Sequence, residues 1–338
     1  MPKDERLILA LNCGSSSLKY GAYRANDEDV RLVCEGEAEE IKDYGAAFEE
    51  AWDFFAQKGI KDFWCVGHRV VHGGPGLRDH QLLTDGVLDQ LRGAIPFAPL
   101  HLPASLGVID AVREKLPKLT QVICLDTAFH RSIPEIARTF ALPEEVRKLG
   151  VQRYGFHGLS LESILAQLHP APRNLVVAHL GNGCSITAIK NGKSIDTSMG
   201  MTPTGGVMMG TRCGDLDPGV MIFLARHGFA NPEALEDLVN RKSGLLGVSN
   251  VSSDVRHIPP DDLSLQMFCY QVRKTIAGMA AALDGLDLLV FAGGIGEHAD
   301  ALRQQICDKL DWIDPFEIRV VPAQEDLQIA RIALSCCK

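Results

Sequence analysis

The chain has 338 residues, 46% of them hydrophobic, and a formal net charge of −9, which fits a globular protein large enough for two domains. The acidic balance argues against non-specific nucleic-acid binding, which needs a basic surface, but not against an anionic substrate, because local arginines reverse the field inside a cleft. The apolar run near the N-terminus is too short for a signal peptide or membrane span. We therefore expect a cytoplasmic protein with ten reduced cysteines and no membrane partner.

The first predicted element is a strand–turn–strand unit. The apolar run 7–11 is followed by Asn-Cys-Gly-Ser-Ser-Ser, and apolar residues resume at Leu18. Glycine and serine reverse the backbone at low cost and leave N–H groups and hydroxyls facing one point. Beside a lysine, such a nest suits phosphate oxygens, although an ordinary serine-rich hairpin is the alternative. The residues predicted to face a phosphate are Asn12, Ser15, Ser17 and Lys19.

Further along the chain, strands are predicted at residues 30–34, 62–71 and 121–125, and helices at residues 46–57, 82–92 and 104–116. Residues 96–103 contain three prolines and are expected to form a rigid loop rather than a helix. Two charged residues stand near predicted strand ends, Arg69 before a glycine pair and Asp126 after a buried strand. Ligands bind at such strand ends in α/β sheets. A solvated arginine and a turn-capping aspartate are the alternatives.

Residues 174–189 repeat the order of the first unit, with an apolar run, a Gly/Asn/Ser turn and a second apolar run. The turn glycines Gly14 and Gly181 lie 167 residues apart (181 − 14), about half the chain. A unit repeated at half-length predicts two copies of one domain, each offering a small-residue loop to a shared cleft. Opposed hairpins of this kind describe a nucleotide clamp, and coincidental hairpins are the alternative.

Residues 128–153 are interpreted as the crossing between the domains, and His157 follows on a loop where ligand contact competes with a core role. The loop 197–219 is long and rich in small residues, which indicates function, and it carries Arg212. A glycine run over 293–297 lies between a predicted strand and a predicted helix, where it suits the phosphates or sugar of a nucleotide. In this half, helices are also predicted at 160–168, 223–226, 233–241, 265–285, 299–309 and 325–334, and strands at 287–292 and 318–321.

With these segments in place, the chain resembles the acetate kinases of the acetate/propionate kinase family. The matching motifs occur in family order at residues 12–19, 68–74, 99–101, 126–130, 154–158, 179–183, 210–218, 252–254 and 293–297. The resemblance implies the α/β fold shared with sugar kinases, Hsp70 and actin, with two ribonuclease-H-like domains, each a mixed β-sheet with helices, around an interdomain cleft. The first would be residues 1–128 completed by a C-terminal helix at 325–338, and the second residues 129–324 with the nucleotide site. A homodimer is also implied.

The resemblance further implies phosphoryl transfer from ATP to a carboxylate, in which catalysis depends mainly on positioning and positive charge. Arg69 and Arg212 would flank the phosphoryl group, His157 would donate a hydrogen bond to it, and His101 would support them. Asp126, also implied as catalytic, would hold Mg²⁺, or Mn²⁺ in its place. The implied metal site is completed by Glu325, with Asn12 nearby.

Contacts to the two substrates are implied as well. Those to the ATP or ADP phosphates come from His179, Asn182 and Gly183. Those bordering the nucleoside come from Asp254, Arg256, Gly293, Gly294, Ile295 and Gly296. An apolar pocket beside Arg69 would take the acyl chain and consist of Val71, Leu100, Phe156 and Pro203. Its wall shape would limit chain length, since each buried carbon contributes about 1 kcal/mol.

The expected function is therefore that of an acetate kinase, forming acetyl phosphate reversibly by direct in-line transfer. Alternatives are a propionate or butyrate kinase, a kinase with another phosphoryl donor, and a non-catalytic ATP-binding regulator, against which the intact Arg69, Asp126, His157 and Arg212 speak. The chain departs from the family pattern at 323–326, where Ala-Gln-Glu-Asp replaces Thr-Asn-Glu-Glu. It is also short before residue 68 and between residues 297 and 325.

Overall fold

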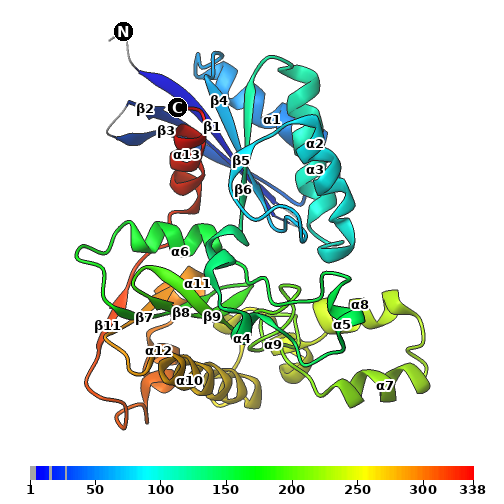
Figure 1. Ribbon diagram of the computed structural model, residues 1–338, viewed down its shortest axis with the longest axis vertical. Coiled ribbons are helices and arrows are strands. Elements are labelled where there is room, and N and C mark those ends of the chain that lie inside the picture. Colours follow the sequence, from blue (N-terminus) through cyan, green and yellow to red (C-terminus); the bar gives the residue numbers. More distant parts are fainter. Residues whose placement is uncertain (1–4, 15–16, 27–28) are drawn as a thin grey trace. The chain divides into compact units, whose positions relative to one another are not determined.

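The computed structural model describes residues 5–14, 17–26 and 29–338, which form two compact units (Figure 1). Unit 1 contains the described residues up to Arg131, the short segment Gly158–Ser163 and the C-terminal segment Gln324–Lys338. Unit 2 contains Ser132–His157 and Ile164–Ala323. Unit 1 is thus assembled from three separate stretches of the chain.

Unit 1 is built on a six-stranded mixed sheet in the order β3-β2-β1-β4-β6-β5. Its strands are β1 (Arg6–Cys13), β2 (Ser17–Ala25), β3 (Val30–Glu39), β4 (Cys65–Val70), β5 (Gln81–Leu82) and β6 (Thr120–Leu125). Strands β1, β2 and β3 form an antiparallel meander, whereas β1, β4 and β6 run parallel. The carboxyl ends of these parallel strands therefore meet at one edge of the sheet, where α/β folds bind ligands.

Alternating side chains give the sheet of unit 1 two buried faces. Leu9 and Leu11 pack toward α1 (Tyr44–Gln57) and α3 (Leu102–Lys115). Ile8 and Ala10 pack on the opposite face, against α13 (Glu325–Cys336) (Figure 1). The remaining helix beside α3 is α2 (Asp85–Gly93), whose N-terminal amide at Val87 donates to the Thr84 hydroxyl. The last helix of the chain is thus part of the first core.

The predicted loop over residues 96–103 is partly wrong. Ile95–Phe97 forms a 3-10 helix, η1, and α3 already begins at Leu102 with Pro103 in its first turn. Proline is tolerated there because the first N–H groups of a helix have no intrahelical partner. The predicted strand at 30–34 likewise extends to Glu39 as β3.

Unit 2 repeats this plan with a five-stranded sheet in the order β11-β10-β7-β8-β9. Strands β7, β8 and β9 form an antiparallel meander, and β7, β10 and β11 run parallel. The strands are β7 (Asn174–Leu180), β8 (Cys184–Lys190), β9 (Lys193–Thr197), β10 (Leu288–Ala292) and β11 (Glu317–Val320). The shared arrangement of the two sheets confirms the duplicated mixed-sheet fold predicted from the two hairpins.

A long helix, α10 (Leu263–Leu283), packs against β7 and β8 of unit 2. The glycine run at 293–297 follows strand β10, as predicted, and forms a short helix of its own, α11 (Gly293–His298), before α12 (Asp300–Cys307). The remaining short elements are η2 (Ala128–Ser132), α4 (Glu135–Arg138), α5 (Glu144–Arg147), α6 (Gly158–Leu165), α7 (Pro218–Arg226), α8 (Pro232–Arg241), α9 (Gly244–Ser249) and η3 (Val255–His257).

The long loop expected after residue 197 has no helix or strand until α7 begins at Pro218. The ten cysteines are free thiols. Within the part of the chain that the structure describes, every helix is too short or too polar to cross a membrane.

Candidate active site

Five polar residues of unit 1 meet where the parallel strands end, and we call them the strand-end cluster: Asn12, Arg69, Asp126, Glu325 and Asp326. Arg69 donates two hydrogen bonds to Oδ2 of Asp126, from Nε at 3.0 Å and from Nη2 at 2.7 Å. Its Nη1 donates to Oδ1 of Asn12 at 3.0 Å. The guanidinium is therefore fixed in one orientation, with its side chain 18% exposed.

The start of α13 fixes the other side of Asn12. The amide Nδ2 of Asn12 donates to Oδ1 of Asp326 at 2.7 Å and more weakly to Oε2 of Glu325 at 3.4 Å. The two ends of the Asn12 amide thus have defined roles, with oxygen toward Arg69 and nitrogen toward α13. Lys19 lies opposite Asn12 in the β1–β2 register, so both side chains leave the same face of the sheet.

The electrostatics of the strand-end cluster favour an added cation. Burial raises the pKa of Asp126, and Arg69 acts against that rise. Burial alone lowers the pKa of Arg69, but Asp126 and then Glu325 outweigh it and raise that pKa. Burial also raises the pKa of Asp326. With Lys19 nearby, three carboxyl groups stand against two cations, which leaves one negative charge uncompensated when all are ionised.

In unit 2, the turn that joins β7 to β8 lies against His157. Nδ1 of His157 pairs with the Ser185 hydroxyl at 3.0 Å, and its ring stacks on His179 with 4.3 Å between centroids. A Cβ at Gly183 would lie 3.0 Å from Nε2 of His157 and 3.4 Å from Nη1 of Arg212. Both side chains therefore approach the turn closely, and an added methyl group at Gly183 would press on the His157 ring.

Arg212 is held by its own loop. Its Nη1 donates to the carbonyl of Pro203 at 3.0 Å and contacts the Met209 sulfur at 3.7 Å. His157 itself has a left-handed backbone with φ of 61°, a conformation that non-glycine residues adopt at a cost of about 1 kcal/mol or more. Residues in this conformation concentrate at functional sites. Here His157 and Arg212 both lie close to Gly183 in the turn between β7 and β8.

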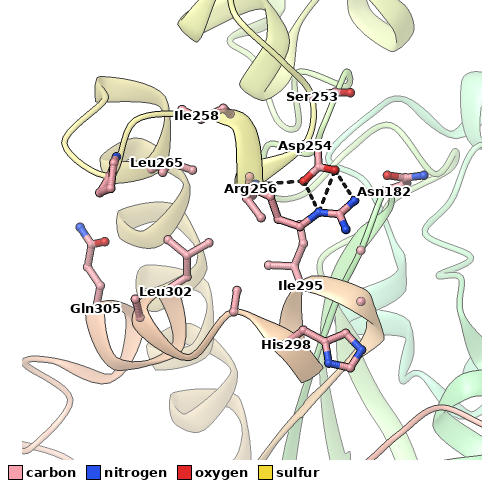
Figure 2. Close-up of a pocket in the computed structure, with 16 residues that line it drawn as sticks. Asn182, Ser253, Asp254, Arg256, Ile258, Leu265, Ile295, His298, Leu302 and Gln305 are labelled. Carbon is pink, nitrogen blue, oxygen red and sulfur yellow. Dashed lines mark hydrogen bonds and ion pairs between the residues drawn. The ribbon is translucent and has the colours of Figure 1, made fainter.

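A cavity of about 700 Å³ opens beside this hairpin and lies entirely within unit 2. Figure 2 shows its apolar end, formed by Ile258, Leu265 and Leu302, and its polar end near Asn182. There Arg256 holds Asp254 with Nε at 3.0 Å and Nη2 at 2.5 Å (Figure 2). These hydrogen bonds lower the pKa of Asp254 to about 2. An apolar pocket of this size with polar groups at one end suits a ring system bearing a polar tail.

Comparison of the sequence and the structure with known proteins identifies the family to which the chain is related. The model of the Acetokinase family matches residues 37–320. The acetate kinase of Rhodopseudomonas palustris is 38% identical over 385 aligned positions, covering 96% of this chain and 97% of that protein. The crystal structure of Porphyromonas gingivalis acetate kinase superposes with a TM-score of 0.87 at 33% identity, covering 98% and 100%. A propionate kinase from Francisella tularensis gives 0.86 at 32% identity, covering 98% and 99%.

The chain belongs to the acetokinase family. This confirms the family and the fold class expected from the sequence, and it confirms that the protein is a kinase. The alignment with the Rhodopseudomonas relative is longer than the chain itself, so it contains gaps in this chain.

The sequence resemblance implied a divalent cation, and the residues of the strand-end cluster fit one. Oδ1 of Asp126 is buried and has no hydrogen-bond partner among the described residues, so its lone pairs are available to a metal ion. Among these same residues, no three His, Cys, Asp or Glu side chains form a ready-made metal site. Mg²⁺ is typically held by one or two carboxylates, waters and substrate phosphates, and the Asp126 oxygen would supply one such contact.

The structure places most other predicted residues at strand ends or in the cavity. Asn182, Asp254, Arg256, Gly294 and Ile295 line the cavity, whereas Gly293 and Gly296 do not appear in its lining. In unit 1, Ser17 lies at the start of β2, and Ser15 falls outside the described residues. His101 immediately precedes α3. The predicted acyl-pocket residues divide between the units, Val71 and Leu100 in unit 1 and Phe156 and Pro203 in unit 2, so that pocket stays a prediction.

The apolar wall of the cavity was missed by the sequence analysis. Leu265 comes from α10 and Leu302 from α12, at positions that read as ordinary core residues of amphipathic helices. Gln305, at the apolar end of the cavity in Figure 2, was also missed, because a glutamine on an amphipathic helix reads as a solvent-facing residue. Only the pairing of these helices, not their own pattern, shows that they border a cavity.

Proposed function

We propose that this chain is a Mg²⁺-dependent acetate kinase that transfers the γ-phosphoryl group of ATP to acetate and forms acetyl phosphate and ADP reversibly. A carboxylate oxygen of acetate forms the new bond to phosphorus, while the bond to the bridging oxygen of ADP breaks. The fixed Arg69 fork beside the unpartnered Asp126 oxygen is the observation that carries the proposal. Both reactants are anions, so a positioned cation lowers the barrier by reducing their repulsion.

The proposed roles follow the chemistry of each group. Arg69 and Arg212 stabilise the charge that develops on the phosphoryl oxygens, and His157 donates a hydrogen bond to them with support from His101. Asp126 and Glu325 hold the ion, which when bound neutralises phosphate charge. Because their guanidinium groups are held by protein acceptors in advance, the arginines need little reorganisation during the reaction.

ATP is the proposed donor because the unit 2 cavity suits a nucleoside. Its volume of about 700 Å³ lies within the range of ligand pockets, and its apolar wall matches a heteroaromatic base. His179, Asn182 and Gly183 at the hairpin turn are the proposed phosphate contacts. A donor without a nucleoside would leave this apolar cavity without a role.

The reaction is tested by trapping acyl phosphate with hydroxylamine after incubation with MgATP and acetate, propionate or butyrate. We expect a hydroxamate with acetate that requires both ATP and Mg²⁺, and ATP formation from ADP and acetyl phosphate. The matched control is Asp110→Asn, at an exposed ion pair with Arg92 in unit 1. No product with any acid, together with normal ATP binding, would refute the kinase and favour the ATP-binding regulator.

A second candidate acceptor is propionate. The propionate kinase from Francisella tularensis is about as similar in structure as the acetate kinase from Porphyromonas gingivalis, with TM-scores of 0.86 and 0.87. A higher kcat/KM for propionate than for acetate in the same assay would decide for this candidate.

Cytoplasmic location and assembly as a homodimer are further proposals from the resemblance. Helix α7 supports an oligomer, because none of its residues is buried in the single chain although most are apolar. Val220, Ile222 and Phe223 are among those exposed. Light scattering coupled to size exclusion measures the mass, and we expect twice the chain mass of 36.8 kDa.

A further inference from the structure

A carboxylate outside the strand-end cluster connects its two sides. Glu162 lies on α6, and its side chain is 18% exposed. Oε1 of Glu162 pairs with Nε2 of His80 at 3.1 Å, and Oε2 accepts a hydrogen bond from Nε2 of Gln328 at 3.1 Å. Both oxygens of one carboxylate are therefore used, each toward a different part of unit 1.

His80 connects Glu162 to the strand that ends just before Asp126. The backbone N–H of Leu125 donates to Nδ1 of His80 at 3.0 Å, which makes Nδ1 an acceptor and leaves the proton on Nε2, facing Glu162. Leu125 is the last residue of β6 and directly precedes Asp126. The imidazole thus connects the Glu162 carboxylate to the backbone that carries the Asp126 side chain.

Gln328 connects Glu162 to α13, the helix that carries Glu325 and Asp326. It lies three residues after Glu325 on α13, so its hydrogen bond to Glu162 connects the beginning of that helix to α6. Two further hydrogen bonds hold α6 against the same two segments. The N–H of Gly158 donates to the Asp126 carbonyl at 2.9 Å, and the N–H of Gln324 donates to the Ser163 hydroxyl at 3.0 Å. Helix α6 therefore spans from Asp126 to the first turn of α13.

We propose that Glu162 is a positioning residue whose carboxylate, held between His80 and Gln328, sets the spacing between Asp126 and the carboxylates of α13 and with it the affinity for the divalent cation. This rests on the proposed metal site of the kinase. Residues that orient metal ligands without touching the metal typically change affinity or activity by about 10- to 100-fold when replaced.

The test measures Mn²⁺ binding in the presence of ADP, from the electron paramagnetic resonance signal of free Mn²⁺. Glu162→Ala should weaken Mn²⁺ binding about tenfold or more, Gln328→Leu should weaken it less, and a His80→Ala/Glu162→Ala double variant should be no weaker than Glu162→Ala alone. The Asp110→Ala control, at an ion pair of the same unit, should bind as the unaltered protein does.

The Mg²⁺ dependence of kcat is a second measurement, and a general loss of structure would not change it in the way predicted here. In Glu162→Ala, raising the Mg²⁺ concentration should restore kcat, while KM for acetate stays unchanged. Equal Mn²⁺ affinity in Glu162→Ala and the unaltered protein, or a kcat that excess Mg²⁺ does not restore, overturns the positioning role. If Glu162→Ala does not fold, Gln328→Leu decides by the same criteria. Equal Mn²⁺ binding by Asp126→Asn and the unaltered protein instead overturns the metal site, and with it the proposed function.

Discussion

Lowering the pH below 6.5 should destabilise unit 1 through one buried imidazole. His68 lies on β4, is 2% exposed, and donates from Nε2 to Oε1 of Gln121 at 2.8 Å. Burial lowers the pKa of His68 from its usual 6.5 to about 4, because the charged form loses its water. The unfolded chain therefore binds a proton between these values that the folded chain does not, and stability falls as pH falls through this window.

The magnitude follows from linkage. A difference of 2.5 between the usual and the shifted pKa corresponds to about 3 kcal/mol below pH 4. Between pH 7.5 and pH 5 the same two values predict a loss of about 2 kcal/mol in the free energy of unfolding. A large part of the stability of an ordinary domain is then lost within a mild pH range.

Urea unfolding at pH 5 to 7.5 measures this loss. Trp52 and Trp64 lie in unit 1, so their fluorescence in a Trp312→Phe background reports on that unit. His68→Asn keeps a donor for Gln121 but cannot titrate. At neutral pH this variant should have a lower free energy of unfolding than the protein with His68. Between pH 7.5 and pH 5 the difference in the free energy of unfolding between the two proteins should narrow by about 2 kcal/mol. Parallel pH curves for the two proteins would refute the reasoning, since other titrating groups cancel in the difference.

The remaining predictions concern the proposed chemistry. Arg69→Ala and Arg212→Ala should each lower kcat by roughly 10³-fold with unchanged circular dichroism, and a loss below tenfold in folded protein would remove that arginine from the mechanism. Gly183→Ala places a methyl group 3.0 Å from Nε2 of His157, so turnover should fall while the melting temperature stays within a few degrees. The matched control is Gly278→Ala on α10, where the added methyl group has open space, and it should leave turnover unchanged. Chelation of divalent cations should abolish acyl phosphate formation, and activity that persists in excess chelator contradicts the proposed metal requirement.

Three members of the strand-end cluster were singled out from their local sequence, Glu325 was implied only by the family resemblance, and Asp326 was not predicted. Asn12 and Asp126 stand at the ends of apolar runs, and such runs are recognisable as buried strands without knowledge of the fold. Arg69 was singled out by the glycines that follow it. In each case the relevant information lies within about ten residues of the chain, which is the range over which periodicity and turn chemistry act.

What the sequence did not predict depends on contacts between distant segments. Glu162 reads as a solvent-facing helical carboxylate, and nothing near it points to His80 or Gln328. The helix over the glycine run before α12 was not predicted, because glycine disfavours helix by about 1 kcal/mol per residue, whereas the packing of α11 on β7 and β10 overrides that preference. Local propensity is a weak guide where a short helix packs on a sheet.

The contribution of α13 to unit 1 has a consequence for the order of events at the ribosome. Strands β1, β4 and β6 emerge early, yet the face that carries Ile8, Cys65 and Val122 is covered mainly by α13, which follows all of unit 2 in the chain. All of unit 2 is translated first, which at roughly 5–20 residues per second takes on the order of ten seconds or more. During that interval one apolar face of the sheet lacks the cover of α13, so we expect chaperones to bind the nascent chain while unit 2 is being translated. The strand-end cluster gains Glu325 and Asp326 only after all of unit 2 has been translated.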